Sequence, residues 1–412
     1  MKALGMRSWL ALGVSLLSLL GWTALSATGI RHGNFLFHQA ARRPFLDLYE
    51  HFTDGTVLLG HGDIYQLRPF LNNSNPPVVT LLYLPLRALG ETLSADVMIF
   101  LSLVALSATS AACLFRLGVA RWSRAILVSS LFIVPLALVG CEPLRAMLKA
   151  GQIRGLLLLL VVVDLLVVPA RRRGFLTGLA GAIAITPLAF AALVAFSAGR
   201  RALWRSLASF TAWTMLGLGV GWHAFFRYWL VLLPTGQQAS RVLLPYPPGS
   251  DPYASRGQAS LRALLARPPL NHLPAPWLIW GLLVLLLAGL SWWVVTRLSR
   301  AGLVVSATAL FASSLLIIEP ATWNHYWMWG LLAIPAAAEC WPRTRGLALA
   351  GLLVPLVSLP PLTHVMNYVG KALVWPGAAT GIYPVASVLW LLTAALVLRR
   401  WSGDESTPTW WG

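Results

Sequence analysis

The sequence GFLTGLAGAIAITPLAFAALVAFSA, residues 174–198, decides how this chain has to cross a membrane. It has no charged residue, Thr186-Pro187 interrupts its centre, and arginine runs flank it at 171–173 and 199–205. Short loops rich in Lys and Arg stay on the cytoplasmic side of a membrane. A single span would put one arginine run outside, whereas two short helices that meet at Thr186-Pro187 keep both inside. We therefore expect a broken helix, of the kind tolerated where it lines a cavity, with its break near the external face.

The whole chain has the composition of an integral membrane protein. Of its 412 residues, 58% are hydrophobic and 11% are charged, whereas about a quarter of a soluble domain is charged. A span needs about 20 residues. Besides the broken helix, the segments that satisfy or approach this length are 8–28, 95–115, 125–141, 152–170, 203–223, 276–296, 302–318, 323–339, 346–363 and 378–398.

These segments predict an all-α polytopic membrane protein of about 12 transmembrane helices, folded as a single domain over residues 1–412, with both termini cytoplasmic. The first apolar run is expected to remain as a helix rather than to be removed as a signal peptide. Residues 77–90, PVVTLLYLPLRALG, are short and contain Pro85. They are interpreted as re-entrant or interfacial, and the alternative that they span the membrane remains open.

The formal charge of +18 comes from basic residues whose positions agree with the same topology. The basic residues lie mostly in short runs between apolar segments, which is the positive-inside pattern and not a nucleic-acid-binding patch. Two large external segments result, residues 29–94 and 224–275. All eight histidines fall in them or at the outer ends of helices, so the chemistry is expected on the external face.

The first external segment contains RPFLDLYEHFTDG, residues 43–55. Its apolar side chains share one helical face, and Asp47, Glu50, His51 and Asp54 share another. An amphipathic helix in the membrane interface explains this pattern, with the polar face turned to water. It does not explain three acids, which gain nothing from an anionic membrane surface. This surplus of acid favours a functional role.

Two further stretches carry polar groups at outer helix ends. CEPLRAMLKAGQIRG, residues 141–155, aligns polar side chains on one helix face, which a salt-bridged cap would also explain. IEPATWNHYWMW, residues 318–329, has the tryptophans of an interfacial belt, but a belt does not explain Glu319 or His325. There is no zinc-protease motif, glycine-rich phosphate loop or dinucleotide fingerprint. We expect no cofactor and leave a metal requirement open.

Taken in order, six stretches resemble polytopic bacterial mannosyltransferases of the GT-C class, of the type of glycosyltransferase family 87. They are FLDLYEHFTDG with LLGHGDIY, NPPVVTLLYLPL, EPLRAMLKAGQIRGLLLLL, GFLTGLAGAIAITPL, RGQASLRALLAR and EPATWNHYWMW. The resemblance covers about residues 40–340 and implies a GT-C fold. It also implies a polyprenyl-phosphate sugar donor, with mannose the expected hexose, a lipid-linked or glycan acceptor, and a place in the bacterial inner membrane among its lipids.

The resemblance also implies site residues. The family's acid in the first external loop corresponds to Asp47, followed by Tyr49. The other matched positions are Glu142, Pro143, Arg145, Gly151, Gln152, Gln258, Ser260, Leu261, Trp323 and His325. The chain departs from the family where Ala184 replaces a lysine, where Arg154 replaces an asparagine, and where Tyr326 replaces a second histidine. The missing lysine would be expected to hold the lipid phosphate.

An inverting transfer from a lipid phosphate needs few groups. The phosphate leaves without a general acid, and one carboxylate can take the proton of the acceptor hydroxyl. Asp47 is the expected base. The cations available to neutralise the leaving phosphate are Arg145, Lys149, Arg154 and Arg262. His325 is expected either to orient the acceptor or to contact the phosphate, and these roles are not separated.

Two other function classes compete. A transporter would need ionisable groups near the midplane of the bilayer, and Asp164 in LVVVDLLVV is the one central charge. Asp164 is better interpreted as a hydrogen-bonded contact between helices. A noncatalytic membrane scaffold is favoured only by Ala184.

Overall fold

The computed structural model describes residues 6–37, 44–60, 62–65, 75–235, 257–268, 270–372 and 378–400. Within these ranges the chain is helical and forms no strand, and the one isolated bridge pairs Gln258 with Trp323. The expectation of an all-α protein is therefore confirmed. The chain divides into two compact units, which are described separately: residues 1–139 with 144–248, and residues 140–143 with 249–412. The expectation of a single domain stays a prediction.

The first unit contains α1 to α12 and the short helices between them. Their bounds are α1 Met6–His32, α2 Leu46–Leu59, α3 Pro77–Arg87, α4 Glu91–Arg116, α5 Trp122–Val128, η1 Ser129–Ile133, α6 Val134–Gly140, α7 Glu142–Ala150, α8 Arg154–Leu166, η2 Ala170–Arg172, α9 Phe175–Ile183, η3 Thr186–Ala189, α10 Phe190–Ala198, α11 Arg200–Leu216, η4 Gly217–Val220, α12 Trp222–Phe226 and η5 Arg227–Leu232. The last residue of α6 and the first two of α7 belong to the second unit.

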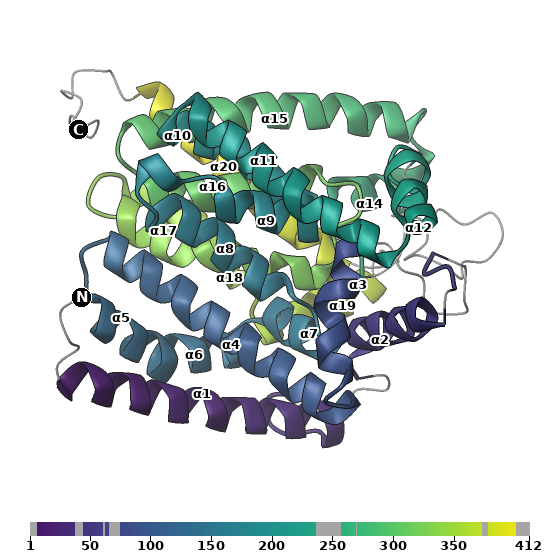
Figure 1. The fold of residues 1–412 in the computed structure, drawn as a ribbon. Coiled ribbons are helices and arrows are strands. Elements are labelled where there is room, and N and C mark those ends of the chain that lie inside the picture. The colour runs from purple at the N-terminus through teal and green to yellow at the C-terminus, as the bar shows by residue number, and fades with distance from the viewer. Residues whose placement is uncertain are drawn as a thin grey trace. The chain divides into compact units, whose positions relative to one another are not determined.

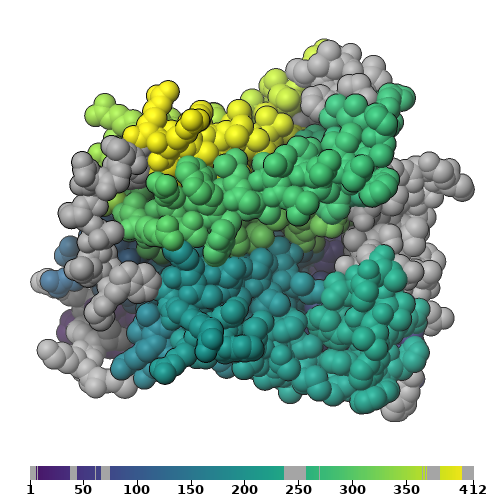
Figure 2. Space-filling model, turned by 90° about the horizontal axis from the view of Figure 1, so that it is seen from above, coloured from purple at the N-terminus to yellow at the C-terminus, as the bar shows by residue number. Residues whose placement is uncertain are grey.

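The second unit contains the remaining helices. Their bounds are α14 Leu261–Leu265, η7 Leu270–His272, α15 Pro276–Arg300, α16 Val304–Ile318, η8 Asn324–Leu332, α17 Ala333–Cys340, α18 Arg345–Leu356, α19 Pro360–Ala372 and α20 Ala378–Arg400. Helix α15 is uncovered along much of its length, with Leu285 and Leu286 each about 70% exposed, and its side chains lie at the surface seen in Figure 2. This is the surface expected of a helix that faces lipid.

Among the described residues, five helices are long and apolar enough to cross a membrane, and the number rises to six if α7 and α8, bent by 118°, form one broken span. The expected total of about 12 spans stays a prediction. The first apolar run forms α1, which runs beside α4 in Figure 1 and is tied to it by an ion pair between Arg31 and Asp96 at 2.6 Å. Helix α3 has 11 residues and rises about 16 Å, too short to cross a hydrocarbon core of about 30 Å alone.

The structure confirms the break in residues 174–198. Helix α9 ends at Ile183, Ala184 is extended with φ −145° and ψ 130°, and the chain turns helical again at Thr186. Helix α9 packs closely on α11. A Cβ added at Gly178 would lie only 2.2 Å from the carbonyl oxygen of Ser206, so glycine is needed at this contact. The break therefore falls in a helix whose backbone is held tightly against its neighbour.

The N-terminus of α9 is capped by a carboxylate from another helix. The amide of Gly174 lies 3.0 Å from both oxygens of Asp164, and Thr177 donates its amide at 3.0 Å and its hydroxyl at 2.6 Å to Oδ2. Asp164 is fully buried. It accepts hydrogen bonds from the first amides of α9, which no side chain at the start of α9 itself caps. The interpretation of Asp164 as a contact between helices is confirmed.

The second unit uses the same device at the start of α16. Glu339 of α17 accepts hydrogen bonds from the amides of Val305 and Ser306 at 3.2 and 2.7 Å and from the Ser306 hydroxyl at 2.6 Å. Each unit thus uses one acidic side chain to satisfy the backbone where a new apolar helix begins.

We expect replacement of Asp164 by alanine to destabilise the protein, because it leaves buried amides at the start of α9 without a partner at about 1–3 kcal/mol for each. Thermal unfolding in detergent measures the loss. Ser209→Ala is the matched control, since it removes one hydrogen bond, from Ser209 of α11 to the Phe175 carbonyl of α9, at the same end of α9. Equal unfolding midpoints for the two variants would contradict the capping role of Asp164.

Candidate active site

Helix α2 confirms the predicted helix in the first external segment. Phe45, Leu48 and Phe52 are buried as expected. The helix starts after Phe45, which has a left-handed backbone with φ 59° and donates its amide to the carbonyl of Lys149 at 2.6 Å. The start of α2 is therefore fixed on the end of α7.

The expectation that the polar face of α2 is turned to water is wrong for two residues. His51 and Asp54 are 6% and 1% exposed. The reason is the packing of α3 against α2, since the His51 ring stacks on Tyr83 of α3 with centroids 4.2 Å apart. An interfacial helix with one wet face has no such neighbour, so the amphipathic pattern alone could not predict this burial.

Asp47 is held by the turn between α7 and α8. Gln152 donates a hydrogen bond from Nε2 to Oδ2 of Asp47. The residue before it, Gly151, has φ +73°, and a Cβ there would lie 2.9 Å from the Cβ of Leu48. Only a glycine lets this turn come so close to α2. The acid and the Gly-Gln element named from the sequence therefore meet in space.

A small pocket lies beside Asp47. Its inner space is roughly 20 Å³, about enough for one water molecule. Its walls are Asp47, His51, Asn75, Val79, Tyr83, Gln152, Ile153, Arg154, Leu157, Ile183 and Ala184. Two helix breaks contribute to it, the turn before α8 and the break after α9. Ala184, the position where the resemblance implies a lysine, thus lines the same pocket as Asp47 and Arg154.

Burial controls the charge of Asp47. Removal from water raises the pKa of this carboxyl from 3.8 to about 6, while the hydrogen bond from Gln152 and the charge of Arg154 act in the opposite direction. A carboxylate with a pKa near 6 is a better proton acceptor at neutral pH than an ordinary aspartate.

Three other site residues predicted in this unit have contacts away from the pocket. The Tyr49 hydroxyl donates to Glu91 of α4. Arg145 donates from one Nη to the carbonyl of Leu36 at 2.6 Å, and the Lys149 ammonium lies 5.4 Å from the centroid of the Phe37 ring. None of the three lines the pocket.

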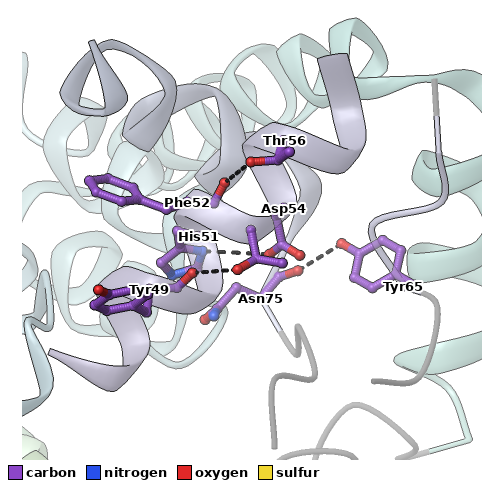
Figure 3. A network of polar contacts seen from close by, with 8 residues as sticks. Tyr49, His51, Phe52, Asp54, Thr56, Tyr65 and Asn75 are labelled. Carbon is purple, nitrogen blue, oxygen red and sulfur yellow. Dashed lines mark hydrogen bonds and ion pairs between the residues drawn. The ribbon is translucent and has the colours of Figure 1, made fainter. Parts of the chain in front are cut away.

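The pocket also contains residues that sequence reasoning did not single out. Tyr83 and Asn75 line it, and the carbonyl of Asn75 accepts a hydrogen bond from the Tyr65 hydroxyl at 2.7 Å, as Figure 3 shows. The double proline at 76–77 marks the start of α3 but gives no sign that these side chains meet α2. Their role follows from tertiary packing alone.

In the second unit, the segment 257–260 is bound to the residues before η8. Ala259 donates to the carbonyl of Thr322 at 2.5 Å, and Ser260 donates its hydroxyl to the carbonyl of Pro320 at 3.0 Å. Ser260 also caps α14 through the amide of Ala263. Gln258 and Ser260 are fully buried. Ser260 therefore supports the backbone, and neither side chain reaches a solvent-facing surface.

His325 is held by a polar chain within the second unit. Its amide donates to Oδ1 of Asn324 at 2.9 Å, and the amide group of Asn324 lies 3.4 Å from Glu142. The hydroxyl of Tyr383 is also 3.4 Å from Glu142. The ring of His325 lies parallel to that of Trp323, with centroids 6.4 Å apart. Glu142 thus faces two hydrogen-bond donors, and one of them, Asn324, also accepts from the backbone amide of His325.

Arg262, the remaining predicted cation, lies over the ring of Trp280 with its Cζ 5.5 Å from the centroid. Among the described residues, no cluster of three His, Cys, Asp or Glu side chains could hold a metal ion.

Comparisons with known proteins give the site a context. The family model of glycosyltransferase family 87 matches residues 73–320. A Mycobacterium tuberculosis protein named polyprenol-phosphate-mannose-dependent alpha-(1-2)-phosphatidylinositol mannoside mannosyltransferase is 28% identical, over 95% of this chain and 89% of its own length. A Mycolicibacterium smegmatis protein of the same name is 24% identical, over 94% of this chain and 87% of its own. No solved structure matches.

We expect Asp47 to titrate near pH 6, with the carboxylate present above this pH and the carboxylic acid below it. Infrared difference spectra recorded from pH 4 to 8 measure the protonated carboxyl band, and Asp47→Asn identifies it by its loss. Gln152→Ala should move the midpoint to higher pH, because it removes a hydrogen bond that favours the charged form. A midpoint near 4 in the unmodified protein would show that Asp47 is well hydrated.

Proposed function

The chain belongs to glycosyltransferase family 87, and from this premise we propose that it transfers mannose from a polyprenyl-phosphate donor to a phosphatidylinositol mannoside or another lipid-linked mannoside. The proposed place of transfer is the external face of a bacterial cell membrane. The observation that carries the proposal is the pocket in which Asp47 and Arg154 lie together. The names of the two relatives, which match nearly the whole chain, support the donor and the kind of acceptor.

Asp47 acts as the general base of an inverting transfer. The 2-hydroxyl of the acceptor mannose attacks the anomeric carbon of the donor, and its proton passes to Asp47. The bond between that carbon and the phosphate oxygen breaks, and the phosphate leaves with the electron pair. The raised pKa of Asp47 and its fixed position on Gln152 support this role, since a base works best when its pKa is near the operating pH.

Arg154 neutralises the leaving phosphate. It is the first residue of the 13-residue helix α8. The positive charge of its guanidinium therefore adds to the partial positive charge of the helix N-terminus. It lines the pocket together with Ala184. A cation on the adjacent wall can thus take over the task that the resemblance assigns to a lysine at position 184. Arg145, Lys149 and Arg262 have contacts elsewhere that make them weaker candidates.

His325 belongs to the acceptor or phosphate side of the same reaction, with Trp323 beside it. Glu142 and Asn324 act as positioning residues for it, because a carboxylate would repel a phosphate. No observation favours transport, since the charge of Asp164 is used by the N-terminus of α9.

The proposal is tested by incubating the purified protein with radiolabelled polyprenyl-phosphate mannose and phosphatidylinositol mannoside. We expect a labelled glycolipid, and we expect Asp47→Asn to lower kcat at least about 100-fold, because loss of a general base typically costs a factor of 10² to 10⁴. Asp63→Asn is the matched control, since Asp63 pairs with Arg227 away from the pocket. Equal product from wild type and Asp47→Asn would refute the base, and no product from any protein would refute the donor.

The phosphate role of Arg154 is tested by moving the charge across the pocket. Arg154→Ala should lower activity about 10- to 100-fold through loss of a charge-assisted contact. The double variant Arg154→Ala with Ala184→Lys should regain a substantial part of it, measured as kcat/KM for the donor. Ala184→Leu in the same background is the control for volume. Recovery with leucine, or none with lysine, would contradict the assignment.

A further inference from the structure

The pocket contains a second hydrogen-bond acceptor that the proposed chemistry does not use. His51 lies four residues after Asp47, so both side chains project from the same face of α2, and both line the pocket. His51 is 6% exposed. Figure 3 shows the contact between His51 and Asp54 on α2. An imidazole so deeply placed has a narrow choice of partners.

The surroundings of the ring set its plane and favour one tautomer. Stacking on Tyr83, at an interplanar angle of 27°, sets the plane. Nδ1 makes no hydrogen bond within the described part of the chain, and it lies 3.9 Å from Oδ2 of Asp54. A carboxylate on that side favours the proton on Nδ1, because a lone pair there would be repelled. The lone pair of the ring is then on Nε2.

His51 is neutral under the conditions in which Asp47 is ionised. Burial lowers the pKa of His51 from 6.5 to about 4, so the imidazole does not compete with Asp47 for a proton. It therefore accepts a hydrogen bond without becoming charged.

The size of the pocket indicates what enters it. The inner space of roughly 20 Å³ takes groups of the size of water or a hydroxyl, so the hydroxyls of a sugar and not its ring would reach Asp47 and His51. Two hydrogen-bond acceptors one helical turn apart are suited to two neighbouring hydroxyls of one sugar, each of which donates to one acceptor. The alpha-(1-2) linkage in the names of the relatives supports the 2-hydroxyl as the attacking group. In a lipid-linked mannoside, its neighbour is the 3-hydroxyl.

We propose that His51 is a specificity-determining residue, whose Nε2 accepts a hydrogen bond from the 3-hydroxyl of the acceptor mannose while Asp47 takes the proton of the 2-hydroxyl. The inference rests on the proposed function and extends it to the acceptor. It assigns the enzyme a preference for an intact pair of neighbouring hydroxyls at positions 2 and 3.

The test compares three synthetic acceptors, octyl α-mannoside and its 3-deoxy and 6-deoxy analogues, with polyprenyl-phosphate mannose as donor. We expect the wild-type protein to use the 3-deoxy acceptor about 10- to 100-fold less efficiently by kcat/KM, the effect of one lost hydrogen bond to a buried partner. His51→Phe keeps the ring that stacks on Tyr83 and removes both nitrogens. The substitution should lower kcat/KM for the full acceptor by a similar factor. The variant should then use the full and the 3-deoxy acceptors equally well.

A purely structural role of His51 would lower activity on all three acceptors by one common factor and leave the discrimination unchanged. That result would overturn the inference. If His51→Phe is inactive on every acceptor, His51→Gln decides, because its amide oxygen accepts a hydrogen bond. If His51→Gln still discriminates against the 3-deoxy acceptor, the inference is supported. If His51→Gln is active but no longer discriminates, the inference is overturned. Inactivity of both variants also overturns the inference.

Two results separate this inference from the proposed function. If the wild-type protein transfers no mannose to any acceptor, the proposed function fails and the inference falls with it. If the wild-type protein transfers mannose equally to the full and the 3-deoxy acceptors, only the role of His51 fails. The 6-deoxy acceptor serves as the control, because its kcat/KM should respond to His51→Phe as that of the full acceptor does.

Discussion

Each place where an apolar helix ends has to satisfy the backbone groups that the ending releases, and this constraint shapes the protein. In hydrocarbon no water is available to these groups, so each unpaired one is costly. At the starts of α9 and α16 the solution is a carboxylate, Asp164 or Glu339, brought in from another helix. At the turn between α7 and α8, no carboxylate of the described residues caps the helix in this way. That turn instead lines the pocket, together with the break after α9.

The site thus arises where interruptions of helices meet the polar face of α2. The break before α8 supplies Gln152 and Arg154, the break after α9 supplies Ala184, and α2 adds Asp47 and His51. Irregular backbone at membrane depth is tolerated where it lines a cavity. This explains how an apolar chain can assemble several polar groups around one small pocket.

The sequence predicted the elements better than their contacts. The helix around Asp47 and the break near Thr186 follow from periodicity and from proline, which are local properties. The family resemblance named Asp47 and Gln152 as site residues, but their hydrogen bond was not predicted, because no local pattern reports a contact between residues 105 positions apart. The burial of His51 could not be predicted, because it depends on the packing of α3. For the same reason Ser260, expected to bind substrate, is found buried as a helix cap.

The tight turn at Gly151 has a consequence for how such chains are recognised. Its positive φ and its approach to Leu48 leave no room for a side chain, and the turn is what brings the Gln152 amide to the carboxylate. A chain that keeps the acid but lacks this glycine would retain a carboxylate with nothing to orient it. The smallest residue of the site is therefore a better indicator of a working enzyme than the acid, because an aspartate on an amphipathic helix has many ordinary explanations and a glycine in this backbone conformation has few.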